Sequence, residues 1–270
     1  MKTTFVGSRW TIVLAGLLSA FLFLPPSSFA QSRLPQIQQQ KEVRFGWGEF
    51  RPYESRDVVS GQLQGPLIDM ADELAKSLGA NPKFVLDSWP TLPAGIAANR
   101  FDLVIMGYSD GRAQTIDFSR PLYTAQFTAL SRADSGVASW DQLNVAGRKI
   151  AVTTGSSSDE QLMKLEKQGG LKAEVVRIRD VGAAILALQS HNVDGYVNQR
   201  DVLSLMAKAR GGELKVLAGS FGDTWFGVAL PKGDPALRQA VNKAIGEMIG
   251  ANYIAQVLAK YNIDGAQQAK

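Results

Sequence analysis

Residues 96–107 read IAANRFDLVIMG and residues 186–199 read LALQSHNVDGYVNQ, and both stretches follow the same plan. Each runs from a helix-like segment through a turn that contains asparagine to an aspartate, Asp102 or Asp194, which opens a short strand. An echo of a dozen residues is weak evidence for a true repeat. It still predicts two similar halves, because a helix that leads into a buried strand is the unit of a parallel sheet.

Alternating strand and helix patterns extend outward from both stretches. Short apolar runs between turn residues predict strands, and longer segments with apolar residues at helical spacing predict helices. A helix at 235–250 begins with Pro235, which favours the first turn of a helix, and carries an apolar face. The other predicted strands are 43–47, 83–87, 103–106, 149–153, 174–178 and 195–197, and the other predicted helices are 67–78, 158–168 and 181–190.

Two more strand-like runs, residues 127–131 and 225–230, lie between the halves and are bounded by polar loops. We expect the chain to leave a first lobe through one run and to return through the other. The two runs would then form a two-stranded hinge about which the lobes close on a ligand. The predicted fold class is therefore α/β with two lobes, each a mostly parallel sheet flanked by helices.

The first thirty residues have the pattern of a secretory signal peptide, in which two basic residues precede an apolar run at 10–24. The small residues Ser28 and Ala30 predict cleavage before Gln31 and export of the mature chain. An uncleaved anchor is the less favoured alternative, because the run is shorter than the ~20 residues of a membrane span. Residues 31–40, QSRLPQIQQQ, are polar and predict a flexible leader.

Composition excludes several functions. The chain has no cysteine and one histidine, His191, in a turn where a structural role is expected. It therefore offers no disulfides, no metal-ligand cluster and no Ser-His-Asp triad. Glycine-rich phosphate loops are also missing, so no cofactor is predicted. Cleavage of the leader removes two basic residues and no acid, which lowers the formal charge from +4 to +2 and argues against binding to nucleic acid.

Five loops follow the predicted strands, and ligands of open α/β sheets lie beyond the carboxyl ends of the strands. One loop, GYSDGR, ends at Arg112, whose planar guanidinium can grip a carboxylate, although a lone arginine is more often solvated. Another, TGSSS at 154–158, precedes a helix whose first N–H groups either bind an anion or are only capped. The other three loops are residues 48–53, 88–91 and 198–200.

Three aromatic residues, Phe50, Tyr53 and Trp89, lie beside prolines or glycines in these loops. Rings in such places form walls for a flat or apolar ligand body. The alternative is that they close the ends of the sheet as part of the core. Sequence alone leaves both interpretations open.

Six motifs in a fixed order make the chain resemble a known family. They are FRPYE (50–54), GPLIDMADELAKSLG (65–79), SWPTLPAGIAANRFDLVIMG (88–107), GRAQTIDFSRPLY (111–123), IAVTTGSSSDEQL (150–162) and VDGYV (193–197). Together, over residues 43–261, they resemble the bacterial periplasmic solute-binding proteins of polar amino acid ABC importers, solute-binding protein family 3. No single motif is decisive, but their order and spacing are specific.

The resemblance implies the two-lobed type II periplasmic binding protein fold. Such a protein is a monomer and not an enzyme, and it delivers a small solute to an ABC permease in the inner membrane. We expect lobe 1 to comprise residues 41–127 and 223–262, and lobe 2 residues 128–222. Residues 263–270 would form a C-terminal tail.

The resemblance also implies roles for individual residues. In this family, the arginine that precedes an FS-x-P run binds the carboxylate of the ligand, and Arg112 occupies this place. Aromatic residues in the first loop and after the third strand flank the ligand, which matches Phe50 and Trp89. The helix N-terminus of the second lobe donates hydrogen bonds to the carboxylate, which matches Ser156 and Ser157.

The chain departs from the family in two places. The stretch Asp102–Arg112 is two residues short and lacks a ligand-binding hydroxyl, which Ser109 or Gly107 replaces only in part. Gln199 stands where the family has an aspartate for the ammonium group of the ligand, and an amide is a poor partner for a buried charge. We therefore expect a carboxylate ligand that is not a standard α-amino acid, or one whose amine is met by Glu49.

Two other functions remain open at this point. Residues 88–107 also resemble periplasmic cyclohexadienyl dehydratases, which need a carboxylic acid in the cleft to protonate the departing hydroxyl. Their acid is a glutamate on the helix after the second VD strand. Here Val202 stands at that position, and the neighbouring Asp201 is expected to point elsewhere. A binding protein that reports to a membrane sensor is the third possibility.

Overall fold

The computed structural model describes residues 1–4, 32–50 and 53–270. Most of the predicted signal peptide, including the cleavage point, lies outside the described residues. Within the described part of the chain, no helix is long and apolar enough to cross a membrane.

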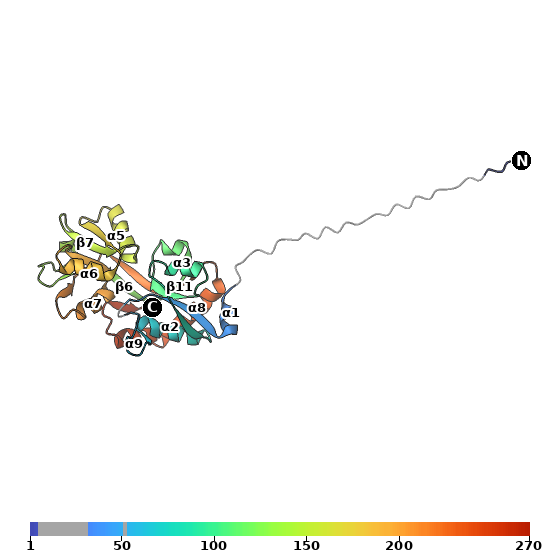
Figure 1. The fold of residues 1–270 in the computed structure, drawn as a ribbon, viewed down its shortest axis with the longest axis horizontal. Helices are drawn as coiled ribbons and strands as arrows, with labels where there is room; N and C mark the ends of the chain where they lie inside the picture. Colours follow the sequence, from blue (N-terminus) through green and yellow to red (C-terminus); the bar gives the residue numbers. More distant parts are fainter. Residues whose placement is uncertain (5–31, 51–52) are drawn as a thin grey trace.

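The first lobe is built on three strands, β1 (Glu42–Trp47), β4 (Asn81–Leu86) and β5 (Val104–Gly107). β1 and β4 pair in parallel, and a parallel bridge between Phe45 and Leu103 links β1 to the chain that enters β5. A short hairpin of β2 (Ser55–Arg56) and β3 (Leu63–Gln64) follows β1. The helices of this lobe are α2 (Pro66–Ser77), α3 (Leu92–Ala97), α8 (Pro235–Gly250) and α9 (Tyr253–Lys260) (Figure 1).

The second lobe is built on β7 (Lys149–Thr153), β8 (Glu174–Ile178) and β9 (Gly195–Gln199), which pair in parallel with β7 in the middle. Figure 1 shows this lobe beside the first, with β6 and β11 passing between them. Its helices are α4 (Trp140–Leu143), α5 (Ser157–Lys167), α6 (Val181–Gln189) and α7 (Arg200–Lys208).

Two long strands form the hinge. β6 (Ile116–Arg132) and β11 (Gly222–Pro231) pair antiparallel, from Ile116 opposite Pro231 to Phe127 opposite Gly222. β11 also pairs with β5 of the first lobe, and β6 also pairs with β9 of the second. One sheet therefore runs through both lobes, and the predicted two-stranded crossing is confirmed.

The echo between the halves has a structural basis. Asp102 accepts a hydrogen bond from the backbone N–H of Arg44 at 2.9 Å and pairs with its guanidinium at 2.6 Å. Asp194 accepts one from the N–H of Lys149 at 2.8 Å and pairs with Arg148 at 2.6 Å. In each half, the aspartate that precedes one strand thus binds the start of the neighbouring strand. Both halves use an aspartate at this place for the same structural purpose, which explains why the same pattern occurs twice.

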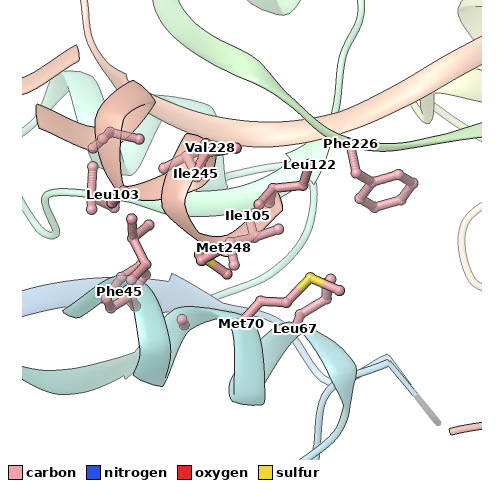
Figure 2. Packing of buried hydrophobic residues seen from close by; sticks show 14 of the residues in the cluster. Phe45, Leu67, Met70, Leu103, Ile105, Leu122, Phe226, Val228, Ile245 and Met248 are labelled. Carbon is pink, nitrogen blue, oxygen red and sulfur yellow. The ribbon is translucent and has the colours of Figure 1, made fainter. Parts of the chain in front are cut away.

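Buried apolar side chains fix the position of each sheet. The largest cluster lies in the first lobe, where strands β1, β5, β6 and β11 pack against α2, α8 and α9. Each large apolar side chain buried here stabilises the fold by ~1.5–3 kcal/mol. Two further clusters belong to the second lobe. Figure 2 shows part of the first cluster, with Phe45, Leu67, Met70, Leu103, Ile105, Leu122, Phe226, Val228, Ile245 and Met248.

Both chain ends form regular structure. Residues 34–40, predicted as part of a flexible leader, form helix α1 (Leu34–Gln40), and Ile37 is buried in the first core. Arg33, just before this helix, donates from its side chain to the carbonyl oxygens of Phe101 and Ile96. Polar composition misled the prediction of a flexible leader, because a buried side chain and the contacts of Arg33 order this segment. At the other end, the predicted C-terminal tail contains β12 (Ala266–Gln268), which pairs with β6.

Candidate functional site

Loops from both lobes meet where strands β5, β7 and β9 end. Gln199 Nε2 donates a hydrogen bond to Ser157 Oγ at 2.8 Å. A Cβ atom added to Gly107 would lie 3.4 Å from each of these two atoms. The structure thus brings together three of the residues predicted from strand ends, at a point where the first lobe faces the second.

Arg112 begins a short 3-10 helix, Arg112–Gln114, directly after this loop. Its Nη1 donates to the carbonyl oxygen of Gly107 at 2.7 Å, and its backbone N–H donates to Ser109 Oγ at 3.3 Å. Burial lowers the pKa of Arg112, and the nearby Glu160 carboxylate opposes this shift. The guanidinium makes no other hydrogen bond to the described residues, so its remaining donors can hold an anion.

Glu160 reaches from α5 of the second lobe to the loop of the first. Its Oε1 accepts from Ser109 Oγ at 2.9 Å, and its Oε2 accepts from the backbone N–H of Gly111 at 3.3 Å. We call this set the outer contact, because Glu160 and Gly111 are not buried. Glu160 was not predicted to contact the first lobe, since an acid in the first turn of a helix usually serves only the helix dipole.

The start of α5 uses its three serines differently. Ser156 is the N-cap, and its hydroxyl accepts from the backbone N–H of Asp159 at 3.2 Å. Ser157 is buried and faces Gln199, while Ser158 Oγ lies 3.5 Å from Asn198 Oδ1. Capping therefore occupies the Ser156 hydroxyl, and Ser157 is the serine whose hydroxyl lies close to Gly107 of the first lobe.

The three predicted aromatic residues are neighbours. Phe50 stacks on Tyr53 with ring centroids 5.5 Å apart and meets Trp89 edge-on at 5.6 Å. Trp89 also covers Gly48, where an added Cβ would lie 3.0 Å from the indole. Its Nε1 is buried and lacks a hydrogen-bond partner among the described residues. Tyr53 is fully buried in the first core, as the core interpretation had it, whereas Phe50 and Trp89 are only partly buried and form an apolar wall beside the end of β1.

A second contact between the lobes was not foreseen. Tyr53 donates its hydroxyl hydrogen to Asp201 Oδ2 at 2.5 Å, and both side chains are fully buried. We call this the inner contact. Asp201 was expected only to point away from the position of the dehydratase acid, and its contact with Tyr53 was missed because α7 packs against the cores of both lobes. Val202 and Leu205 lie in the first core, and Leu203 lies in a core of the second.

The inner contact contains ionisable groups in apolar surroundings. Burial raises the pKa of Asp201 to about 6, although the hydrogen bond from Tyr53 opposes the shift. Burial also raises the pKa of Glu54 to about 8, against the hydrogen bond from Gly48 and with help from the charge of Glu49. Asp201 Oδ1 and the hydroxyl of Tyr123 have no partner among the described residues. The core around the inner contact therefore contains buried polar atoms without a hydrogen-bond partner among the described residues, which is uncommon in folded proteins.

The predicted site residues thus fall into three groups. Gly107, Ser157, Gln199 and the guanidinium of Arg112 lie close together between the lobes, with Ser109 bonded to Arg112, and Phe50 and Trp89 form the ring wall. Ser156 caps its helix, while Glu49 is exposed. Among residues 32–50 and 53–270, no group of three or more His, Cys, Asp or Glu residues is placed to hold a metal ion.

Comparisons with known proteins agree with this architecture. The probable histidine-binding protein of Neisseria gonorrhoeae is 28% identical over 228 residues, which cover 82% of this chain and 83% of that protein. The L-cystine-binding protein of Escherichia coli (strain K12) is 28% identical over 253 residues, which cover 92% of each chain.

A solved structure is also similar. The ancestral amino acid-binding protein described as a precursor of cyclohexadienyl dehydratase matches with a TM-score of 0.73 at 28% identity, covering 85% of this chain and 99% of its own. The sequence model of the bacterial extracellular solute-binding proteins, family 3, matches residues 43–264. The chain therefore belongs to family 3 of the bacterial extracellular solute-binding proteins.

Proposed function

We propose that this protein captures an amino acid between its lobes as the periplasmic binding component of an ABC importer. The observation that carries the proposal is Arg112, whose guanidinium keeps free donors at the point where Gly107 faces Ser157 and Gln199. A carboxylate bound there would receive a bidentate pair of charge-assisted hydrogen bonds. Two relatives named as histidine-binding and L-cystine-binding proteins support an amino acid as the ligand.

Capture would proceed by closure of the lobes. The first lobe would bind the solute through Arg112, with Phe50 and Trp89 against its body. The second lobe would then add Ser157 and Gln199, together with the N-terminus of α5. Only contacts that exist solely in the closed form can favour closure. The names of the relatives favour an ordinary amino acid over the alternative of a ligand without an α-amino group.

A thermal-shift screen tests the proposal. The purified protein is heated with each standard amino acid, with L-cystine and L-ornithine, and with a matched set of organic acids. A ligand at 100 times its dissociation constant stabilises the folded state by about 2.7 kcal/mol, so a true ligand raises the melting temperature by several degrees. We expect at least one amino acid to do so. Stabilisation by organic acids alone would contradict the amino acid proposal.

One observation favours a second candidate, the dehydratase. Asp201 is a buried acid with a raised pKa, and general acids that protonate a leaving group have this property. Against this, its Oδ2 is engaged by Tyr53, and Val202 is buried in apolar surroundings. Release of phenylpyruvate from prephenate is the assay, and turnover at ordinary enzyme rates would replace the binding proposal.

Export and partner choice are also part of the proposal. The signal-like leader supports delivery to the periplasm, where the mature chain would begin at Gln31. Sequencing the N-terminus of the secreted protein checks this point. A permease and its ATPase encoded beside this chain would support the importer, whereas a neighbouring sensor kinase alone would favour the sensor alternative.

A further inference from the structure

The ammonium group of an α-amino acid needs a negative partner in the proposed site. Gln199 lies beside Gly107 and Ser157 in the proposed site, but its amide is uncharged and already donates to Ser157 Oγ. A buried ammonium without a counter-charge is strongly disfavoured. Another residue must therefore supply the negative charge if an ordinary amino acid binds here.

The positions of the nearby acidic residues indicate which of them can bind the ammonium group. The carboxylate and ammonium of an α-amino acid share one carbon atom, so their protein partners must be neighbours. Asp201 is engaged by Tyr53, and burial raises its pKa to about 6. Burial raises the pKa of Glu54 to about 8, so it is a poor anion at neutral pH. Glu160, in contrast, is the acid whose charge acts on Arg112.

The geometry around Glu160 suits this role. Ser109 links the two charged residues, because its Oγ donates to Glu160 Oε1 at 2.9 Å and accepts from the backbone N–H of Arg112 at 3.3 Å. Gly111 N–H binds the second oxygen, Oε2, at 3.3 Å. A carboxylate has about four acceptor sites, so two remain open. No ion pair joins Arg112 and Glu160 in the described part of the chain, yet the charge of Glu160 acts on Arg112, so a positive and a negative group lie near each other without neutralising each other directly.

We infer that Glu160 binds the α-ammonium group of the ligand while Arg112 binds its α-carboxylate, so that together they select zwitterionic amino acids. The inference rests on the proposed function, and it puts Glu160 in the place of Glu49 as the partner of the amine. The bonds from Ser109 and Gly111 hold the carboxylate of Glu160 against the first lobe. The side chain of Glu160 would then both hold the second lobe against the first and bind the amine of the ligand.

The test compares wild type and two variants on pairs of ligands, each pair an amino acid and its deaminated counterpart. L-histidine, L-glutamine and L-arginine are titrated by calorimetry, each beside its deaminated counterpart, imidazolepropionate, glutaramate or guanidinovalerate. E160Q keeps the shape of the side chain and an acceptor for Ser109 but loses the charge. E166Q is the matched control, because Glu166 is an exposed acid further along the same helix. Weak analogues are measured by competition with the parent amino acid.

We expect E160Q to weaken the amino acid that binds wild type by at least about tenfold, the loss of one charge-assisted bond. The deaminated analogue should stay within about threefold of its wild-type affinity, and E166Q should change neither. Equal weakening of both ligands would show that Glu160 only holds the lobes together and would overturn the inference. An unchanged amino acid affinity would overturn it as well. Absence of binding to wild type by all three amino acids and by the wider screen would instead defeat the proposed function.

Discussion

The outer and inner contacts both join the lobes through a carboxylate, but in opposite surroundings. Glu160 of the outer contact is partly exposed and binds Ser109 and the N–H of Gly111. Asp201 of the inner contact is fully buried and binds Tyr53 at 2.5 Å. Water can replace the partners of the first carboxylate when the lobes part, whereas the second is enclosed by the cores of both lobes.

This difference assigns the two contacts different tasks. Polar contacts with access to water are worth little to stability, so the outer contact is free to serve a ligand. A buried acid has a large desolvation cost, and its partner therefore matters to folding. Variants near the outer contact should change affinity with little effect on unfolding. Variants of the inner contact should change unfolding and its dependence on pH.

The largest expected effect is that of Arg112→Ala on affinity. Removing a buried partner of a charged ligand group costs about 2 to 5 kcal/mol, which is roughly 30-fold or more in the dissociation constant. Calorimetry with the amino acid found in the screen measures it. Arg238→Ala, an exposed arginine on α8, is the control and should bind as wild type does. Unchanged affinity in Arg112→Ala would place the ligand elsewhere.

The next effect concerns the pH dependence of stability at Asp201. The folded state holds the proton of this acid up to a pKa of about 6, against 3.8 ordinarily. As pH rises from 4 to 6 the unfolded state ionises first, so the folded state loses up to about 3 kcal/mol through this group. Asp201→Asn abolishes this loss. Its unfolding free energy, relative to wild type, should therefore rise by about that amount from pH 4 to pH 7.

Urea unfolding at a series of pH values measures this difference. The exposed Asp141→Asn serves as the control, and its difference from wild type should stay flat over the same range. Glu54 titrates in both proteins, so its contribution cancels. A flat difference for Asp201→Asn would mean that the carboxyl is not desolvated in the folded protein.

A smaller effect is expected for Tyr53→Phe. The change leaves both oxygens of Asp201 buried without the hydroxyl donor, which costs about 1 to 3 kcal/mol of unfolding free energy. Tyr108→Phe is the matched control, because its hydroxyl donates to Asp110 at an exposed site. A Tyr53→Phe variant as stable as Tyr108→Phe would remove the distinction between the two contacts.

The smallest effect belongs to Ser109→Ala in the outer contact. It removes the hydroxyl that holds Glu160 and should cost about 0.5 to 1.5 kcal/mol in ligand binding, which is two- to tenfold in affinity. The urea midpoint of the ligand-free protein should stay near that of wild type. A large loss of stability with unchanged affinity would reverse the roles assigned to the two contacts.

Much of the fold could be predicted from local sequence. Strand β8 at Glu174–Ile178 and helix α8 at Pro235–Gly250 have the bounds predicted for them. Buried parallel strands read as apolar runs, and proline with a preceding Asp234 marks a helix start. Helix α1 was missed because Ile37 is its one buried residue, and the contacts of Arg33 that fix this segment join it to distant parts of the chain.

The neighbours in the candidate site could be predicted only where position along a strand decides which residues meet. Gly107, Arg112, Ser157 and Gln199 follow strand ends, and the rule that ligands bind there brought them together. The inner contact joins residues 148 positions apart, and no local pattern couples Tyr53 to Asp201. The two residues meet only in the folded protein, where the cores of both lobes pack around them.

A crystal structure of the complex with the amino acid from the screen would show directly whether the ligand binds between the lobes at Arg112. We expect the carboxylate of the ligand to lie on the guanidinium of Arg112, between Gly107 and Ser157, with its body against Phe50 and Trp89. A ligand bound outside the two lobes, or one whose carboxylate points away from Arg112, would contradict it.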